Sequence, residues 1–498
     1  MIKRISQAWG FAAILLLPGY VDLTSSLGDE RMHVSWPLTH MALAQIVDMA
    51  IVALIFAGLM AILRKLKSWA RIRWFVLALL PIYLLLCSLR IFPFRVPYTA
   101  LTAASVAWIA ALALLVFRAP SIASKFYGLA SAVLTGAAVF GLVMTVQLVR
   151  AALWRPGPQA FATSIPAQPA TRPRLVWIVF DELAYKPTFE ARDPSLDLPN
   201  FDRLRRQSAL YTDVTPIGYH TNLVVPGLLT GHLVTSATFT SDNQYLIRTP
   251  DSTHWQPFDV SASIFGLAKQ RGVTSSIVGW YLAYCPIFAG TATECYWSND
   301  DTEDGAPPSL DASFAEEVWY PLRIVAEQLL APRVAVADVV LWESQSHMAT
   351  VKDLSQHALA TLADSQADII YLHLPAPHPP NFWDRHTHTF AVGGSYIDSL
   401  DYSDALLGQM LDILEAQPRW KETSLVVQGD HSWRTRLWRT TPGWSAGDER
   451  FSHGGEWDPR PLMIIHSAGQ TEAETVTAPT SLMLVHDFAL SQIETISR

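Results

Sequence analysis

The first 150 residues contain five apolar segments, and this feature limits the possible folds of the chain most strongly. A helix needs about 20 apolar residues to cross the hydrocarbon core of a membrane. The pattern therefore predicts a transmembrane α-helical domain of about five spans over residues 1–150. A cleaved signal peptide is the alternative for the first segment, and a bundle of buried helices is the alternative for the whole region. The segments are residues 8–23, 41–63, 74–89, 99–117 and 127–149.

Lysine and arginine residues between these segments indicate how the chain crosses the membrane. Lys3, Arg4, the cluster within 64–73, Arg118 and Lys125 fall on one side, and the opposite loops carry fewer basic residues. Loops rich in lysine and arginine stay in the cytoplasm. We therefore expect a multi-pass protein of the bacterial inner (cytoplasmic) membrane, with everything after the fifth segment in the periplasm.

The net charge and the cysteine positions indicate which partners are excluded and which cellular compartment is possible. The net charge of −8 argues against a nucleic-acid partner, which would need a basic surface. Cys87 lies inside an apolar segment and is expected to pack there. Cys285 and Cys295 share a loop-like segment, where an oxidising compartment would allow a disulfide, and two free thiols are the alternative.

The composition changes after the fifth apolar segment. Five prolines between residues 155 and 174 predict an extended linker over 151–174. From 175 to 498, apolar runs alternate with helical stretches, which predicts an α/β domain with a mainly parallel central sheet. Residues 299–363 are expected to form an insertion over that sheet. The predicted strands are 175–180, 275–280, 368–373 and 424–428, and a helix is predicted at 396–414.

Acidic and histidine residues follow the predicted strands, where ligands collect in open α/β sheets. Asp181 and Glu182 follow the first strand, Asp430 and His431 follow the last, and His453 comes later. Carboxylates with imidazoles suit zinc, or manganese where oxygen ligands dominate. An acidic pair after a strand more often caps the next helix. The assignment of these residues as metal ligands therefore depends on the motifs around them.

Seven short motifs between about residues 174 and 465 occur in an order that resembles the sulfatase-like branch of the alkaline phosphatase superfamily. Each motif is loose, but the ordered set is specific. The resemblance implies an alkaline-phosphatase-like α/β fold with a metal-dependent covalent nucleophile. The motifs are PRLVWIVFDEL, LPNFDRL, T-x4-P-x2-LTG, LHLPAPH, YIDSLDYSD, VVQGDH and SHGGEWDPRPL.

The nucleophile position separates the members of this superfamily. Sulfatases carry a cysteine or serine ten residues before the glycine of LTG and convert it to formylglycine, but here Thr221 stands ten residues before Gly231. Threonine cannot supply formylglycine, so sulfate-ester hydrolysis by that route is disfavoured. Threonine at this position resembles phosphoethanolamine transferases, lipoteichoic acid synthases and nucleotide pyrophosphatase/phosphodiesterases, and the spacing to Pro226 is similar to that of the first group.

By this resemblance, Thr221 is the nucleophile, and a divalent metal lowers the pKa of its hydroxyl. The implied ligands are Thr221, Asp430, His431 and an acidic residue of the FDEL motif. That motif departs from the related transferases, which leaves open whether Asp181, Glu182 or both bind the metal. The expected cofactor is zinc, with manganese as the alternative. The resemblance leaves open whether the site holds one metal ion or two.

Three further histidines have less defined roles. His378 and His453 are candidates for stabilising the charge of the transferred group, for protonating the leaving oxygen or for binding a second metal. His373, at a strand end beside prolines, fits a structural role as well as a ligand role.

The expected function is transfer of a phospho-headgroup from a phospholipid donor in the membrane to a glycan or lipid acceptor through Thr221. A membrane anchor favours membrane lipids as partners, since a soluble substrate needs no anchor. The first alternative is a membrane-anchored phosphodiesterase that uses water as acceptor. A non-catalytic scaffold or sensor is a further alternative, but it predicts missing catalytic residues, and none is missing.

Overall fold

The computed structural model divides the chain into two compact units. One comprises the described parts of Met1–Ser25, Val34–Arg155 and Glu303–Val339, and the other comprises the remainder. The predicted linker, residues 151–174, lies partly outside the described residues. The structure describes residues 2–17, 19–20, 38–63, 65, 83, 98–153, 165, 168–169, 171–239, 244–298, 313–330 and 336–498.

The first unit is helical. Two of its helices, within His40–Leu63 and Gly128–Arg150, are long and apolar enough to cross a membrane. The predicted segments 41–63 and 127–149 are thereby confirmed as apolar helices of spanning length, whereas 99–117 forms a shorter apolar helix. The first predicted segment continues beyond its helix, and 74–89 lies outside the described residues except for residue 83. The helices are α1 (Ile2–Leu15), α3 (Leu38–Leu63), α5 (Tyr98–Arg118), α6 (Pro120–Leu153) and α11 (Phe314–Leu330).

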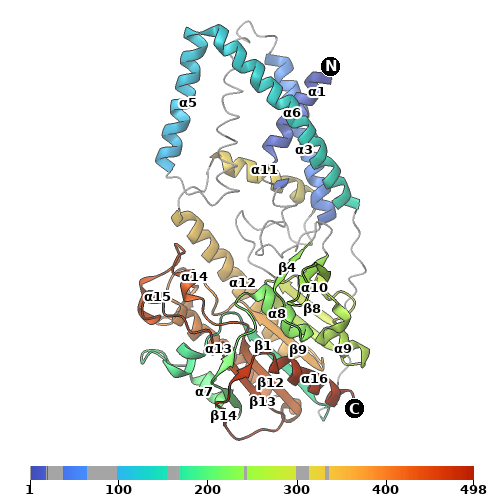
Figure 1. Ribbon diagram of the computed structural model, residues 1–498, viewed down its shortest axis with the longest axis vertical. Coiled ribbons are helices and arrows are strands. Elements are labelled where there is room, and N and C mark those ends of the chain that lie inside the picture. Colours follow the sequence, from blue (N-terminus) through green and yellow to red (C-terminus); the bar gives the residue numbers. More distant parts are fainter. Residues whose placement is uncertain are drawn as a thin grey trace. The chain divides into compact units, whose positions relative to one another are not determined.

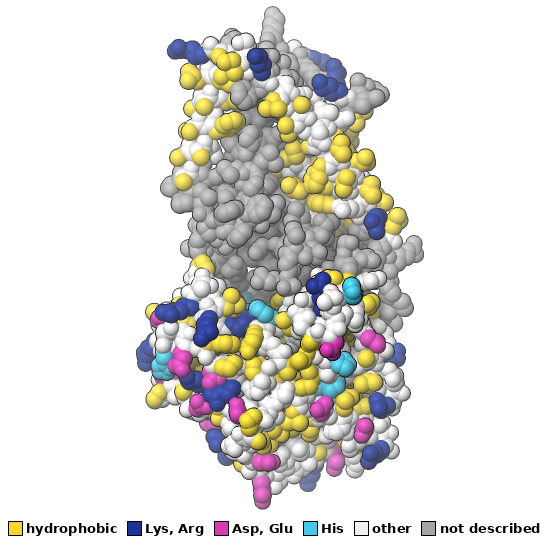
Figure 2. Space-filling model, in the orientation of Figure 1, with side chains coloured by type: hydrophobic (Ala, Val, Ile, Leu, Met, Phe, Trp, Pro, Cys, Tyr) yellow, Lys and Arg dark blue, Asp and Glu magenta, His cyan; other side chains and the backbone are white. Residues whose placement is uncertain are grey.

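Large apolar side chains cover the outer faces of these helices. Figure 2 shows hydrophobic side chains spread over the surfaces of α5 and α6. Leu54, Val139 and Leu153 are 73%, 68% and 74% exposed. Apolar residues normally gain about 25 cal/mol per Å² when they leave water. A surface of this kind is what a helix presents to lipid.

Helix α11 corrects the predicted domain boundary. We expected residues 299–363 to form one insertion over the sheet, within the domain 175–498. Instead α11 packs with α3, and Val325 is buried in the same apolar core as Phe56 and Met60. The prediction is right for α12 (Val336–Asp364), whose later turns bury Leu354 and Leu362 in the core of the sheet.

The second unit is built on an eight-stranded, mainly parallel sheet with the order β14-β2-β13-β12-β1-β9-β7-β8. The four predicted strands are confirmed, and so is the mainly parallel arrangement. Only β13 runs antiparallel to its neighbours. The strands are β1 (Arg174–Phe180), β2 (Ala209–Tyr211), β7 (Ser275–Trp280), β8 (Glu294–Ser298), β9 (Ile369–Leu374), β12 (Thr423–Gly429), β13 (Met463–His466) and β14 (Glu474–Val476).

Helices cover both faces of this sheet, as Figure 1 shows. The central strand β1 is buried along its whole length, and its side chains alternate between the two cores. One core takes Ile178 together with α7 (Pro199–Arg205), α12 and α13 (Tyr396–Glu415), the predicted helix 396–414. The second core contains Trp177 and lies between the sheet and three helices, α8 (Thr221–Thr230), α9 (Ile264–Gln270) and α16 (Leu484–Ile496).

Smaller elements complete the unit. Cys285 and Cys295 form a disulfide that joins α10 to β8, so the disulfide is observed rather than two free thiols. The small sheets are β4-β5-β6 (Ser236–Phe239, Tyr245–Arg248, Gln256–Pro257), β3-β15 (Val214–Thr215, Thr480–Ser481) and β10-β11 (Trp383–Asp384, Thr389–Phe390). The short helices are α10 (Tyr284–Ile287), α14 (Thr435–Trp438), α15 (Ala446–Phe451), η1 (Lys186–Glu190), η2 (Val260–Ala262) and η3 (Pro418–Glu422).

Candidate metal centre

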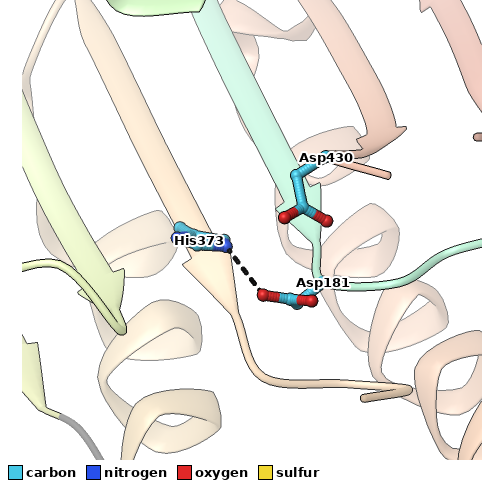
Figure 3. A group of neighbouring side chains, drawn as sticks. All are labelled: Asp181, His373 and Asp430. Atoms are coloured by element: carbon cyan, nitrogen blue, oxygen red, sulfur yellow. Dashed lines mark ion pairs between the residues drawn. The ribbon is translucent and has the colours of Figure 1, made fainter. Parts of the chain in front are cut away.

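Three neighbouring parallel strands bring the predicted ligands together. Phe180 of β1 pairs with Gly429 of β12, so the next residues, Asp181 and Asp430, leave the sheet side by side. On the other side of β1, β9 carries His373 at the same edge of the sheet. Figure 3 shows the Asp181, His373 and Asp430 side chains converging at this edge. Parallel strands place their carboxyl ends at one edge, which is why residues far apart in sequence meet here.

The distances between these ligand atoms suit a metal ion. Nε2 of His373 lies 3.6 Å from Oδ2 of Asp181. Nε2 of His431 lies 3.2 Å from Oδ2 of Asp430 and 3.8 Å from Oδ1 of Asp181. Two ligand atoms at zinc-bonding distance in a tetrahedral shell are about 3.4 Å apart. The spacing is therefore that of donors around a common centre.

Unpartnered buried atoms show that the residues fit a cation. Oδ1 of Asp181, Nε2 of His373 and Oδ2 of Asp430 are buried and have no hydrogen-bond partner among the residues that the structure describes. Buried polar atoms are nearly always paired, so three unpaired ones at one point need an explanation. Burial raises the pKa of both Asp181 and Asp430, and a bound cation would reverse that effect. Burial lowers the pKa of His373 to about 4, which keeps this imidazole neutral, as a metal ligand must be.

Thr221 lies at this centre. Its hydroxyl donates a hydrogen bond of 2.9 Å to Oδ2 of Asp181, and its Oγ1 lies 3.4 Å from Nε2 of His431. His220 is the N-cap of α8, so Thr221 is the first residue inside the helix, and its hydroxyl donates to Asp181 instead. An ordinary helix-cap role therefore does not explain this threonine. The N-terminus of a helix carries partial positive charge, which suits an anionic group.

Glu182 has a different environment from Asp181. Its buried carboxylate accepts hydrogen bonds from the Arg434 guanidinium and from the Trp438 indole, whose Nε1 lies 2.9 Å from each oxygen. Burial raises the pKa of Glu182, and the cation of Arg434 opposes this shift. Asp181, Glu182 and His378 also offer one atom each within 4.8 Å of one another, a second grouping able to hold a metal.

The two catalytic histidine candidates lie in different places. Nε2 of His378 is 3.1 Å from the Arg434 guanidinium, which only donates, so Nε2 is an acceptor. Burial, followed by the charge of Arg434, holds the pKa of His378 well below its usual range. His453 is exposed and lines a cavity with Lys186 and Trp433. Among the described residues, no hydrogen bond or ion pair joins His453 to Thr221 or to the ligands.

Arg434 and Tyr284 were missed by sequence reasoning. Arg434 follows His431 by three residues, and this closeness was the only signal available. Tyr284 precedes the disulfide residue Cys285, and its hydroxyl lies 2.8 Å from Nδ1 of His373. Gly279 leaves room for the tyrosine ring, because a Cβ there would lie 2.1 Å from a ring carbon.

An α/β domain with carboxylates, imidazoles and a hydroxyl at the carboxyl edge of a parallel sheet is the arrangement expected of a metal-dependent hydrolase or transferase of the alkaline phosphatase type. The comparisons agree. The Sulfatase family matches residues 173–492, and the chain belongs to this family. Its members are enzymes of the hydrolase type that use a divalent metal. No curated protein matches the chain.

Solved structures with a similar fold are distant. A structure of Ps i-CgsB in complex with k-i-k-neocarrahexaose is 15% identical (TM-score 0.42), covering 65% of this chain and 72% of that one. A protein in the alkaline phosphatase superfamily from Vibrio parahaemolyticus is 14% identical (TM-score 0.38), covering 66% and 72%. The phosphonate monoester hydrolase SpPMH from Silicibacter pomeroyi is 12% identical (TM-score 0.38), covering 65% and 73%.

Proposed function

We propose that this chain is a metal-dependent phosphotransferase that moves a phospholipid-derived phospho-headgroup to a glycan or lipid acceptor through a covalent intermediate on Thr221. The observation that carries the proposal is the buried Thr221 hydroxyl, 2.9 Å from Asp181 at a cluster of unpaired ligand atoms. Thr221, Asp181, Asp430 and His431 would hold a divalent metal, zinc or else manganese, and His373 faces the same point. When bound, this ion lowers the pKa of the attacking hydroxyl and offsets charge on the phosphoryl group.

The chemical steps use groups of this chain. Asp181 accepts the hydrogen bond of Thr221 and orients its oxygen for attack on phosphorus. A bond forms between this oxygen and phosphorus, the phosphorus–oxygen bond to diacylglycerol breaks, and the proton lost by threonine balances the one gained by the leaving alcohol. An acceptor hydroxyl then attacks phosphorus, the threonine–phosphorus bond breaks, and Thr221 regains a proton. If water takes the acceptor's place, the same site is a phosphodiesterase, which is the second candidate function.

Features of both units support an extracytoplasmic, membrane-anchored enzyme. The apolar side chains exposed on α3, α5 and α6 suit contact with lipid, which would also hold a phospholipid donor near the enzyme. The Cys285–Cys295 disulfide suits an oxidising compartment such as the periplasm. We therefore propose a multi-pass protein of the bacterial inner membrane with its catalytic unit in the periplasm.

Substitution of Thr221 tests the proposed chemistry. Thr221→Ala should reduce turnover by several orders of magnitude, and Thr221→Ser should retain partial activity because it keeps the hydroxyl. Intact-protein mass spectrometry after incubation with mixed phospholipids should show a headgroup-sized mass on the wild type and none on Thr221→Ala. Thr230→Ala is the matched control, since Thr230 is a buried threonine of the same helix whose hydroxyl donates to the Pro226 carbonyl. A Thr221→Ala variant that works at near the wild-type rate would refute the covalent mechanism.

A further inference from the structure

Arg434 is a largely buried cation at the site, and the nitrogens of its guanidinium lie near three acceptor groups. Its side chain is 15% exposed. Nε donates to Glu182, Nη1 lies 3.1 Å from Nδ1 of His220, and Nη2 lies 3.1 Å from Nε2 of His378. His220 directly precedes Thr221, so the guanidinium lies close to the nucleophile.

The hydrogen bonds of the Glu182 carboxylate are those expected of a residue that holds the Arg434 guanidinium in place. The Trp438 indole and the Arg434 guanidinium donate to its oxygens, whereas Oδ1 of the adjacent Asp181 accepts no hydrogen bond from the described residues. The backbone at Glu182 has a φ of 62°, an uncommon value for a residue other than glycine, and its N–H donates to Oδ1 of Asp430 at 3.1 Å. This local turn lets two consecutive carboxylates reach different partners.

The partners of Arg434 differ in how easily a substrate could replace them. Glu182 carries a full negative charge, so Coulomb attraction between two opposite charges adds to its hydrogen bond with Arg434. The ring nitrogens of His220 and His378 are weaker acceptors when the rings are neutral. An anionic oxygen that approaches Thr221 would therefore displace the imidazoles from Nη1 and Nη2, while the bond to Glu182 persists.

The charges at the site balance when one divalent metal is bound and the Thr221 hydroxyl keeps its proton. Asp181, Glu182 and Asp430 supply three negative charges, whereas the metal supplies two positive charges and Arg434 supplies one. A singly charged substrate therefore leaves one uncompensated charge in a buried place, and a doubly charged substrate leaves two. Uncompensated charge is costly where water is excluded.

We propose that Arg434, anchored by Glu182, binds a non-bridging oxygen of a singly charged phosphodiester, and that the charge balance of the site selects diesters over doubly charged phosphate monoesters. This inference rests on the proposed function and names the charge class of its substrate. It also assigns Glu182 the role of a positioning residue, acting through Arg434.

The test compares bis(4-nitrophenyl) phosphate, a monoanion, with 4-nitrophenyl phosphate, a dianion at pH 8. The wild-type enzyme should have the higher kcat/KM for the diester. Glu182→Gln removes one negative charge and should shift the ratio of the two kcat/KM values toward the monoester by at least about tenfold. Arg434→Gln removes a positive charge and should shift the ratio in the opposite direction. Asp202→Asn, which breaks a similar ion pair with Arg192 elsewhere, is the matched control and should leave the ratio unchanged.

Two measurements other than activity complete the test. By elemental analysis, Glu182→Gln should retain the zinc content of the wild type, and by calorimetry it should bind inorganic phosphate more tightly. Loss of zinc from Glu182→Gln would make Glu182 a ligand and overturn the anchor role. An unchanged ratio with zinc retained, or a wild type that prefers the monoester, would overturn charge selection. None of these results affects the covalent role of Thr221, which its own substitution tests.

Discussion

Tyr284→Phe is the substitution that best tests how the protein holds His373. The variant removes one buried hydroxyl, which lies 2.8 Å from Nδ1 of His373 and 3.2 Å from the hydroxyl of Tyr371. A hydrogen bond at Nδ1 orients the ring and leaves Nε2, which faces Asp181, free to bind a metal. Tyr284 is thus expected to act through His373 rather than on the substrate.

The magnitude follows from the bonds that are lost and kept. Loss of a partner behind a metal-binding histidine typically lowers metal affinity by about 10- to 100-fold. The hydrogen bond of His373 to the Trp280 backbone remains, so we expect the lower end, about tenfold. The buried atoms left unpaired should cost about 1–3 kcal/mol in the free energy of unfolding.

Competition with a chromophoric zinc chelator measures the affinity, and the visible absorption of the cobalt-substituted protein reports the geometry around the metal. Tyr371→Phe is the control, because it removes a buried hydroxyl that lies 3.2 Å from the hydroxyl of Tyr284 and, among the described residues, forms no hydrogen bond with His373. A purely structural role predicts that both variants lose stability while their zinc affinity and cobalt spectra stay unchanged. Zinc affinity of Tyr284→Phe within twofold of the wild type would refute the reasoning.

Three further predictions follow from the site and the apolar helices. Zinc affinity, measured by competition from pH 5 to 8, should rise with pH. Burial raises the pKa of Asp181, so zinc must displace a proton from this carboxyl group at the lower pH values. His373, with a pKa of about 4, is neutral over this pH range and does not contribute to the trend. His453→Ala should lower kcat by less than about tenfold and His378→Ala by more, since His378 is the one of these two histidines that contacts Arg434; steady-state kinetics of the two variants compares them. Alkaline phosphatase fused after residue 155 should be active and β-galactosidase fused there inactive, and the reverse pattern would place the catalytic unit in the cytoplasm.

The sequence predicted those parts of the site that follow from strand ends. Strand patterns at 175–180 and 424–428 located Asp181 and Asp430, and the register of β1 with β12 brings them together. His431 follows Asp430 at the same strand end, the ordered motifs added Thr221, and the structure places Thr221 and His431 at the same point. Local patterns were sufficient here because the ends of adjacent parallel strands meet at a fixed edge of the sheet.

Contacts between distant segments were not predictable in this way. Tyr284 meets His373 across 89 positions, and Arg434 meets Glu182 across 252. Tyr284 and Arg434 lie outside the seven motifs, and their contacts depend on how α10 and the loop after β12 pack. Helix α11 illustrates the same limit, because its amphipathic pattern predicts a helix but does not reveal that its partner is α3 rather than the sheet.

The FDEL motif shows why adjacent residues could not be assigned from their types alone. Asp181 and Glu182 are both buried acids at the end of one strand, and either could bind a metal by its chemistry. Their difference arises after the strand, where the left-handed backbone at Glu182 turns the chain and the indole of Trp438, 256 positions away, reaches both carboxylate oxygens. Glutamate is one methylene longer than aspartate, and its carboxylate reaches both Arg434 and Trp438. We therefore expect Glu182→Asp to lose Arg434 while keeping the metal, and Asp181→Asn to lose the metal, so that metal analysis of these two variants separates the roles of neighbouring carboxylates.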